Sequence, residues 1–421
     1  MRILHTSDWH LGLSQGPCSM GPDHDLFFDW LQRTLAEREI DALVVAGDVF
    51  DTMQPTVDAL GRYFKLLAKI GESGVKQVII IGGNHDSASR LDAPAEVLSA
   101  LQVHVVGGID GSPESQARCL VPLYNRAGEP RAVCLAVPYV HEFRLGVRTT
   151  DLDQQAVRAQ FAERFGAIYS TLCDAAEARF PGLPIVATGH LTMGPATKDD
   201  YPQVIHHVGA VEGLPESVVD PRIQYLALGH IHRSYPVANR RGWYSGSPIA
   251  FNVAEGRTPR RVLEVELSAE PGGSAAVQPL LVPKARSLLE KTGSLDELEA
   301  WISGLQWDDP LPPLLFLRAT LAAPEPALMN RLNAALAKHP EGRRPAIANT
   351  AVLGARAADE RDEGPPPSLA ELKPADVLRQ LCQQRGFNDD DGPLNAAFDT
   401  IVTASNEEWC AQLKRVDQES L

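Results

Sequence analysis

The sequence predicts an α/β protein, and three observations support this fold class. Short apolar runs alternate with stretches of helical periodicity from residue 1 to about residue 265, which is the pattern of βαβ units. Several of the apolar runs end in glycine followed by aspartate, asparagine or histidine. Residues 285–355 then alternate strand and helix patterns on a smaller scale. We expect two sheets stacked between helices in the larger part, because that arrangement buries all of its strands.

The composition limits the ways in which this chain could bind nucleic acid. The chain has 421 residues, 44% of them hydrophobic and 22% charged, which is typical of a globular protein of two or three domains. Its 39 basic and 54 acidic side chains give a net charge of -15. Non-specific DNA affinity comes from Lys and Arg against phosphates, so global charge cannot hold this chain on nucleic acid. Any DNA contact must be local, metal-mediated or shared with a partner.

Cysteine usage and hydropathy predict a cytoplasmic protein. The six cysteines form no Cys-x-x-Cys pair, so reduced thiols are expected. The chain begins without the apolar segment of a signal peptide. No apolar run approaches the ~20 residues of a membrane span, and we expect no membrane partner.

Expected strands end in polar residues at five places. The N-terminal run leads into Asp8 and His10, and the run at residues 43–46 leads through Gly47 into Asp48. Glycine allows a sharp turn as the backbone leaves a sheet, and open α/β sheets bind ligands at the carboxyl ends of their strands. Taken alone, such an ending is equally typical of an ordinary turn.

The same ending recurs after apolar runs at residues 78–81, 185–188 and 225–228. Because the carboxyl ends of parallel strands meet at one edge of a sheet, we expect the polar residues to converge. Aspartate, asparagine and histidine are ligands for borderline-hard metals. The candidate metal ligands are Asp8, His10, Asp48, Asn84, His190, His230 and His232.

Helical periodicity predicts helices at residues 26–39, 56–71, 94–101 and 153–177. Later strands are expected at residues 243–244 and 261–267, and their wider spacing indicates that they could belong to a second sheet. The Gly/Ser/Ala-rich residues 269–276 indicate a loop or boundary.

Residues 285–355 predict a compact α+β module. Ser294 is expected to cap a helix that runs to about residue 303, and residues 326–338 form a second helix. Strands are expected at residues 314–321 and 345–353.

The last part of the chain predicts a linker and two amphipathic helices. Residues 358–367 contain four acidic residues and three consecutive prolines, which favours an exposed, partly stiff linker. Residues 368–385 and 393–413 show helical periodicity. These helices either pack back on their own domain or dock on a partner.

The candidate ligands are numerous enough for two metals with open positions. Asp48 is the natural bridge, because one carboxylate can hold two cations about 3.5–4 Å apart. Such a pair supplies hydroxide near neutral pH and stabilises both oxygens of an in-line displacement at phosphorus. The sequence therefore predicts phosphoester hydrolysis.

His85 is expected to face the substrate rather than a metal, because it is adjacent to Asn84 and neighbouring residues cannot easily reach the same cation. It would donate a proton to the leaving oxygen or a hydrogen bond to the developing charge. Asp51 and Asp86 are candidates for orienting the imidazoles, although either could instead cap a helix or turn. The remaining histidines are interpreted as structural.

Arginines are concentrated between His230 and Val262, where Glu255 is the one acidic residue. Such a local excess suits a phosphate backbone; the alternative is a solvated hairpin with scattered arginines. The candidate DNA-binding residues are Arg233, Arg240, Arg241, Arg257, Arg260 and Arg261.

Five motifs together resemble the calcineurin-like metallophosphoesterases. They are Asp8-x-His10, Gly47-Asp48-x-x-Asp51, Gly83-Asn84-His85-Asp86, Gly189-His190 and Gly229-His230-x-His232, all present and in this order. Residues 3–12, residues 46–52, and residues 227–233 followed by 244–248 resemble, more narrowly, the nucleases of that family that act in double-strand-break repair. The resemblance spans residues 1 to about 265 strongly and the remainder by layout only.

The resemblance implies two Mn²⁺ ions, with Mg²⁺ or another divalent metal as alternatives. One metal would take Asp8, His10, Asp48 and His232, and the other Asp48, Asn84, His190 and His230. His85 would be the catalytic histidine. The fold would be a four-layer αββα sandwich with a small α+β capping domain and C-terminal helices.

The resemblance also implies a DNA nuclease subunit, an exonuclease on double-stranded ends and an endonuclease on hairpins and single strands. Residues 1–280 would be the nuclease domain and residues 281–357 a capping domain that helps select DNA. After the linker at 358–367, residues 368–421 would dock a coiled-coil ATPase. A homodimer within a nucleoid-associated heterotetramer is expected, through helices early in the chain.

Two alternatives use the same residues. A stand-alone metallophosphodiesterase or phosphatase would need the same ligands but has little use for residues 285–421. A non-catalytic scaffold would need neither His85 nor seven converging ligands.

Overall fold

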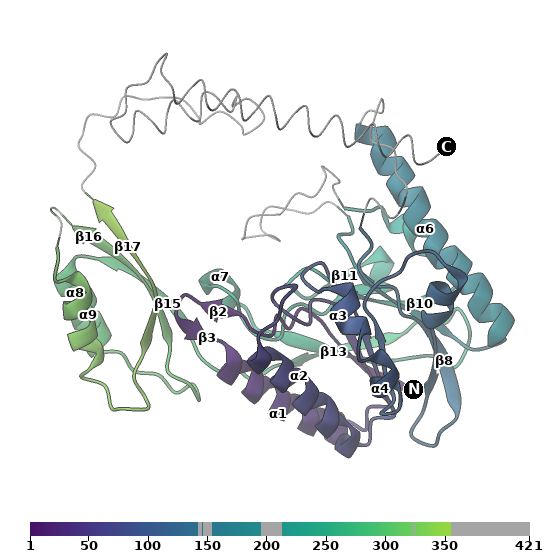
Figure 1. Ribbon diagram of the computed structural model, residues 1–421, viewed down its shortest axis with the longest axis horizontal. Helices are drawn as coiled ribbons and strands as arrows, with labels where there is room; N and C mark the ends of the chain where they lie inside the picture. Colours follow the sequence, from purple (N-terminus) through teal and green to yellow (C-terminus); the bar gives the residue numbers. More distant parts are fainter. Residues whose placement is uncertain (142–144, 146–153, 195–212, 322, 324, 355–421) are drawn as a thin grey trace, which may run out of the picture. The chain divides into compact units, whose positions relative to one another are not determined.

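The computed structural model describes residues 1–141, 145, 154–194, 213–321, 323 and 325–354 (Figure 1). Met1–Ala355 forms one compact unit. The expected linker at residues 358–367 and the expected helices at 368–421 lie outside the described residues. In the part that is described, no helix is both long enough and apolar enough to cross a membrane.

The first sheet has six strands and contains the N-terminal strand near its centre. β1, β4, β5 and β6 run parallel, β13 pairs antiparallel with β1, and β14 pairs antiparallel with β13 at the edge of the sheet. The strand order is β14 (Ala276–Leu281), β13 (Arg261–Glu266), β1 (Arg2–Thr6), β4 (Ala42–Ala46), β5 (Gln77–Ile81) and β6 (Val103–Val106).

The second sheet also has six strands, and its centre is likewise parallel. The strand order is β11 (Tyr235–Val237), β12 (Gly242–Tyr244), β10 (Ile223–Gly229), β9 (Ile185–His190), β8 (Pro130–Leu135) and β7 (Leu120–Tyr124).

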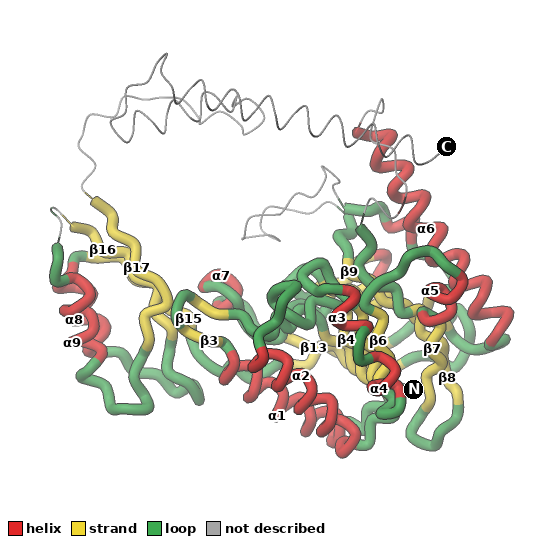
Figure 2. The backbone as a smooth tube through the Cα atoms, viewed as in Figure 1, coloured by secondary structure: helices red, strands yellow, loops and turns green. Residues whose placement is uncertain are grey.

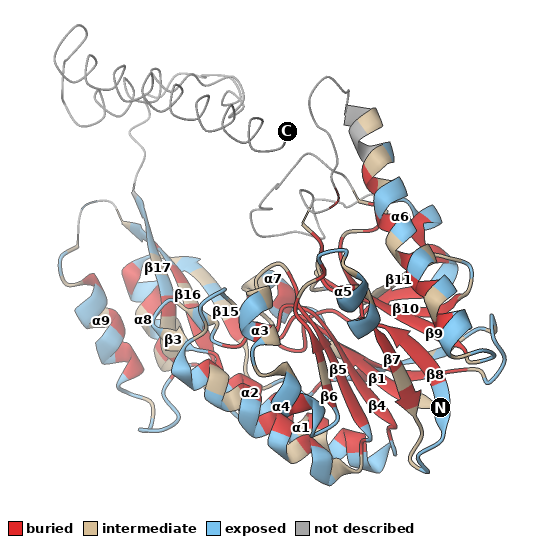
Figure 3. Ribbon diagram, turned by 45° about the vertical axis from the view of Figure 1, so that its right-hand side comes forward, coloured by how far each residue is buried: buried red, intermediate tan, exposed pale blue. Residues whose placement is uncertain are grey.

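Alternating burial in β4 shows how the layers are stacked. Ala42, Val44 and Ala46 join a core shared with the second sheet, whereas Leu43 and Val45 pack on the opposite side. A strand buried on both faces is typical of a sheet covered on both sides, and Figure 3 shows the central strands β1, β4 and β5 as almost wholly buried. The helices that cover the first sheet are α1 (Gly21–Glu37), α2 (Val57–Ile70), α3 (Ala88–Asp92) and α4 (Ala95–Ser99).

The second sheet is covered on its outer side by α6 (Gln154–Arg179), where the Tyr169 hydroxyl donates to the carbonyl oxygen of Thr188 in β9 at 2.8 Å. The layers are therefore helix, sheet, sheet and helix (Figure 2), which confirms the predicted fold class. Shorter elements are the hairpin β2 (Ser14–Gln15) and β3 (Cys18–Ser19), α5 (Pro113–Arg118), α7 (Val253–Gly256), and the 3-10 turns η1 (Gly71–Ser73), η3 (Glu216–Val218) and η4 (Ala238–Arg240).

The small module consists of three parallel strands with two helices on one face. Leu315, Leu317 and Ala319 of the central strand point into the core formed with the helices, and Ser294 begins the first helix with a capping box that includes Glu297. Its elements are β15 (Leu288–Gly293), α8 (Leu295–Ser303), β16 (Leu314–Leu321), α9 (Leu328–Leu336) and β17 (Ala346–Gly354).

The module packs on the helical side of the first sheet through its other face. Leu314 and Ala348 belong to the same buried cluster as α1 and α2. Gly16, in the β2–β3 turn, has φ +55° and approaches the Ala348 carbonyl so closely that an added Cβ would lie 2.1 Å from the oxygen. Only glycine fits there. Arg286 also forms a buried ion pair with Asp23 of α1 at 2.7 Å.

The structure corrects three expectations about the elements. The strand expected at residues 261–267 pairs with β1 in the first sheet, not in the second, whereas residues 243–244 do lie in the second sheet. The helix expected from residue 26 begins at Gly21, where Pro22 occupies the first turn. Strands β6, β7 and β8 lie where the sequence pattern indicated none.

Candidate metal centre

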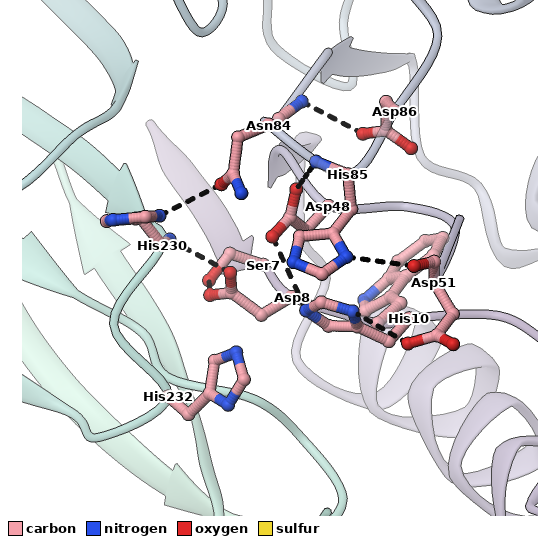
Figure 4. Close-up of polar contacts among 12 residues, drawn as sticks. Ser7, Asp8, His10, Asp48, Asp51, Asn84, His85, Asp86, His230 and His232 are labelled. Atoms are coloured by element: carbon pink, nitrogen blue, oxygen red, sulfur yellow. Dashed lines mark hydrogen bonds and ion pairs between the residues drawn. The ribbon is translucent and has the colours of Figure 1, made fainter. Parts of the chain in front are cut away.

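All seven predicted ligands lie together at the carboxyl ends of strands from both sheets, and Figure 4 shows how most of them face one another. β1, β4 and β5 present ligands from the first sheet, and β9 and β10 present them from the second. Among the described residues, three groups of side chains each have ligand atoms that lie within 4.8 Å of one another. The groups are Asp8, His10 and His232; His10, Asp51 and His85; and Asp8, Asp48 and His190.

Asn84 connects the imidazoles of His190 and His230. Its Oδ1 lies 2.9 Å from Nε2 of His190 and 3.0 Å from Nδ1 of His230. The backbone N–H of His230 donates to Oδ1 of Asp8 at 2.9 Å, so the loop after β10 is fixed to the loop after β1.

The backbone is strained at the ligand positions. Asp8, His10 and Asp48 have φ values of +51°, +47° and +49°, in a region that residues with a Cβ rarely adopt. The loops brace one another: the N–H of Asp8 donates to the Gly47 carbonyl and that of His10 to the Asp48 carbonyl, both at 3.0 Å. At Gly47, with φ +88°, an added Cβ would lie 2.3 Å from Nδ1 of His190, so glycine is required.

Asp48 is the electrostatic centre of the group. Its Oδ2 lies 3.4 Å from Nε2 of His10 and 3.3 Å from Nε2 of His190, and its Oδ1 accepts the N–H of His85 at 2.9 Å. Burial alone would raise the pKa of Asp48, but the neighbouring imidazoles hold it well below its ordinary value. The carboxylate therefore stays charged while it is 2% exposed.

The pKa values of the imidazoles next to Asp48 are shifted upwards. Burial alone would lower their pKa values, but the carboxylates of Asp48, Asp51 and Asp8 raise the pKa of His10 to about 10, and Asp48 with Asp8 raises that of His190 to about 9. Burial and the charge of His190 lower the pKa of His230 to about 3.

This arrangement fits divalent cations. His10 Nε2 is buried and completes no hydrogen bond, although it faces Asp48. Protons on His10 and His190 compensate the concentrated carboxylates, and a metal can replace such protons because it binds the deprotonated ligands. Imidazole, carboxylate and amide oxygen together are a donor set for borderline-hard metals.

Asp51 and Asp86 differ in what they touch. Oδ1 of Asp51 lies 3.3 Å from Nδ1 of His10, in the place expected for a carboxylate that orients an imidazole. Asp86 instead accepts three backbone N–H groups at 2.9–3.0 Å, from Val49, Phe50 and Gly83. Of the two roles left open for Asp86, these contacts match the fixing of a turn rather than the orienting of an imidazole: Asp86 ties the loop after β4 to the loop after β5.

His85 lies at the edge of the centre. Its Nδ1 is 2.8 Å from the Asp51 carbonyl oxygen, so this nitrogen carries the proton and donates. Its ring is 4.7 Å from that of His10, measured between centroids, and it is partly exposed. Nε2 is the ring nitrogen left to meet a substrate.

The six arginines do not form one surface beside the ligands, which corrects that expectation. Arg240 and Arg241 precede β12, which runs parallel to β10, so they lie at the amino end of that strand and away from the edge that carries the ligands. Arg240 stacks over Trp243 at 5.4 Å. Arg260 is largely buried and donates to the His232 carbonyl at 2.8 Å.

Two kinds of supporting residue were missed in the sequence. Ser7 donates to Asp8 and lies 2.7 Å from the Ser245 hydroxyl, so it links the two sheets at the centre. Glu255 contacts His232 from 23 positions later in the chain. No local pattern signals either contact, although Glu255 stands out as an acidic residue among arginines.

Comparison with known proteins shows which family this chain resembles. Residues 1–234 match the family of calcineurin-like phosphoesterases. The SbcD subunit of the SbcCD nuclease from Rhodobacter capsulatus is 32% identical over 352 residues, which cover 80% of this chain and 84% of the relative. The SbcD proteins of Escherichia coli K12 and Bacillus subtilis are 32% and 30% identical, over 73% and 72% of this chain and 74% and 75% of the relatives.

Proposed function

The chain belongs to the calcineurin-like phosphoesterases and, within them, to the SbcD family of nuclease subunits, and on this basis we propose that it is a manganese-dependent DNA nuclease subunit. As a family member it is a phosphoesterase. The observation that carries the proposal is the meeting of seven metal-ligand residues and His85 at one edge of two facing sheets.

The proposed centre holds two Mn²⁺ ions. Asp8, His10, Asp48 and His232 would hold one, and Asp48, Asn84, His190 and His230 the other. Bound cations of this kind supply hydroxide near neutral pH and stabilise charge on the oxygens around phosphorus. The shared ligand Asp48 is suited to bridging, because its Oδ2 lies 3.4 Å from Nε2 of His10, assigned to one cation, and 3.3 Å from Nε2 of His190, assigned to the other.

His85 is proposed to protonate the leaving oxygen. The Asp51 carbonyl fixes its Nδ1–H and so aims Nε2 away from that loop. When Nε2 is protonated it can donate to the oxygen that leaves phosphorus, a contribution of about 10²–10⁴ in rate for a positioned acid. Asp51 thus serves twice, by its carbonyl for His85 and by its carboxylate for His10.

The remaining assignments follow from the family. We propose residues 1–280 as the nuclease domain, 281–357 as a capping domain that helps select DNA, 358–367 as a linker and 368–421 as helices that dock an SbcC-type coiled-coil ATPase. The names of the relatives support this partner and a DNA substrate. Exonuclease action on double-stranded ends and endonuclease action on hairpins and single strands are part of the proposal, as is a cytoplasmic, nucleoid-associated complex.

A homodimer within a heterotetramer is also proposed. Exposed apolar side chains on and beside α1 and α2 support it, because they recur at helical spacing on α2. On α2, Val57 is 87% exposed and Phe64 is 41% exposed. Two further exposed apolar side chains are Met53, which precedes α2, and Leu26, which lies on α1.

The proposal is tested by incubating metal-free protein with linear and hairpin DNA in Mn²⁺, beside an Asp48→Asn variant. We expect cleavage in Mn²⁺ that the variant lacks, because Asp48 is proposed to hold both cations. Turnover of bis-p-nitrophenyl phosphate with DNA untouched, even after the ATPase subunit is added, would favour a stand-alone phosphodiesterase. Absence of turnover on both substrates would favour a scaffold.

A further inference from the structure

Glu255 is a buried carboxylate beside the candidate metal centre that does not belong to the ligand set. It lies in α7 and is 8% exposed, and its Oε1 is 3.3 Å from Nδ1 of His232. We propose that Glu255 is a positioning residue, which orients the His232 imidazole so that Nε2 is presented to a cation. This inference rests on the proposed function, in which His232 is a metal ligand.

The carboxylate of Glu255 is held on both oxygens. Oε2 accepts the N–H of Phe251 at 3.0 Å and lies 3.6 Å from Nη1 of Arg260. Oε1 accepts from Nδ2 of Asn252 at 2.8 Å, and Asn252 in turn caps α7 by accepting the N–H of Glu255 at 2.8 Å. A carboxylate fixed in this way can define the direction of an imidazole.

The backbone of His232 is fixed from the same segment. Arg260 donates from Nη1 to the His232 carbonyl at 2.8 Å and to the Ser247 hydroxyl at 3.2 Å. Glu255 and Arg260 therefore hold the side chain and the main chain of the same residue. Arg260, one of the candidate DNA-binding residues, is committed to this support.

Two other candidate ligand histidines are also held through Nδ1. Nδ1 of His10 faces the Asp51 carboxylate at 3.3 Å, and Nδ1 of His190 lies 2.9 Å from the Ala46 carbonyl. The hydrogen bond made by one ring nitrogen decides which nitrogen binds metal, and a carboxylate partner also raises the basicity of the ligand. Glu255 supplies for His232 what Asp51 supplies for His10.

α7 also contacts the small module. Gly256 lies against Leu288 at the start of β15, where an added Cβ would be 3.6 Å from the Leu288 Cβ. The segment that orients His232 therefore packs on the first strand of the proposed capping domain.

The test measures Mn²⁺ binding by isothermal titration calorimetry for the wild-type chain, Glu255→Gln and Glu255→Ala. Loss of a carboxylate behind a metal-binding histidine weakens metal affinity by about 10–100-fold. We expect that loss for one of two cations in Glu255→Ala, and a smaller one in Glu255→Gln, which keeps an oxygen that accepts from Nδ1. The Mn²⁺ electron paramagnetic resonance spectrum should change from a coupled pair to a single ion at intermediate Mn²⁺ concentration.

Glu264→Gln is the matched control. Glu264 is also 8% exposed and is ion-paired, to Arg38 at 3.1 Å, but it lies in β13 outside the centre. The Glu264→Gln substitution should lower Tm without changing the affinity of the chain for Mn²⁺. If both Glu255 variants bind two Mn²⁺ as the wild type does, the positioning role is overturned and the proposed function stands. If the wild type binds no Mn²⁺, both are overturned.

Discussion

Asp48 shows how individual residues are constrained to build this centre. Its φ of +49° belongs to a region that costs roughly 1–3 kcal/mol for a residue with a side chain. Asp8 and His10 adopt the same kind of conformation. Such strain persists only where the surroundings over-determine it. Here the hydrogen bonds between the loops after β1 and β4 do so.

The convergence of the candidate ligands could be predicted because each follows a recognisable strand end, whereas the residues that support them could not be predicted. Glu255 and Arg260 act on His232 through contacts that depend on how the loop 245–260 folds back. Asp86 illustrates the opposite limit. Its motif position left open whether it orients an imidazole or caps a turn, and only the folded structure shows that three backbone N–H groups converge on it.

His5 is expected to make stability depend on pH. It is fully buried between the sheets, with Nδ1 2.8 Å from the Tyr225 hydroxyl, and burial lowers its pKa to about 3 from 6.5. Below pH 6.5 the unfolded chain binds a proton that the folded chain does not, so stability falls as pH falls. One group shifted in this way costs about 2 kcal/mol between pH 7 and pH 5.

The measurement compares urea unfolding of the wild type and His5→Gln at pH 7 and pH 5. The variant is expected to be less stable at pH 7, because the buried packing is disturbed, but to lose about 2 kcal/mol less on acidification. Equal losses in the two proteins would show that His5 does not titrate in this way.

At the scale of elements, periodicity identified most helices and the ligand-bearing strands. α2 begins at Val57 after the cap Thr56, as expected, and β16 and α8 in the small module also match their expected positions. β13 was assigned to the wrong sheet because partner choice depends on tertiary pairing, which local pattern does not encode. It pairs antiparallel with β1.

The exposed face of α2 gives a prediction for the proposed dimer. Phe64→Asp should shift the chain from dimer to monomer, because it places a charge in an apolar contact. Light scattering over a range of protein concentrations measures this. Leu101→Asp is the control, since Leu101 is 60% exposed and follows α4 rather than lying on α2. A dimer that survives Phe64→Asp but not Leu101→Asp would place the interface elsewhere.

The arginines give a second prediction at this scale. Arg257 is exposed and lines a groove of about 320 Å³ together with Lys284, Arg286 and Arg260, whereas exposed Arg240 lies at the amino end of β12. Arg257→Ala should weaken DNA binding and reduce the slope of log affinity against log salt by about 1. Arg240→Ala should leave both unchanged.

The measurement for this pair is fluorescence anisotropy with labelled duplex DNA at several salt concentrations. Equal effects of the two substitutions would mean that the groove does not contact phosphate. A larger effect of Arg240→Ala would indicate that DNA binds at the amino end of β12, away from the edge of the second sheet that carries the candidate ligands.

At the scale of the whole molecule, the centre requires both sheets. Neither sheet carries all seven candidate ligands. One continuous core of side chains from both sheets holds the carboxyl ends of the ligand-bearing strands close together. The alternation along the sequence allowed this stacking to be predicted, because strands with two apolar faces need cover on each side. The close approach of Gly16 to Ala348 in the small module could not be anticipated, because it joins residues more than 300 positions apart.

Truncation after Ala355 tests the proposed division of labour. Met1–Ala355 is one compact unit that contains every candidate ligand. The truncated chain should keep its Tm and its hydrolysis of bis-p-nitrophenyl phosphate, and should lose capture of an SbcC-type ATPase. Capture that persists at full strength would show that residues 356–421 are not the docking element.

The most direct test of the account is the rate of hairpin-DNA cleavage by His85→Ala, with Mn²⁺ binding measured on the same sample. His85 is proposed to act on the leaving oxygen and not on the metals. We therefore expect unchanged Mn²⁺ affinity and a rate lowered by about 10²–10⁴. Cleavage at the wild-type rate with both cations bound would contradict the assigned role of His85 and with it the mechanism proposed for this centre.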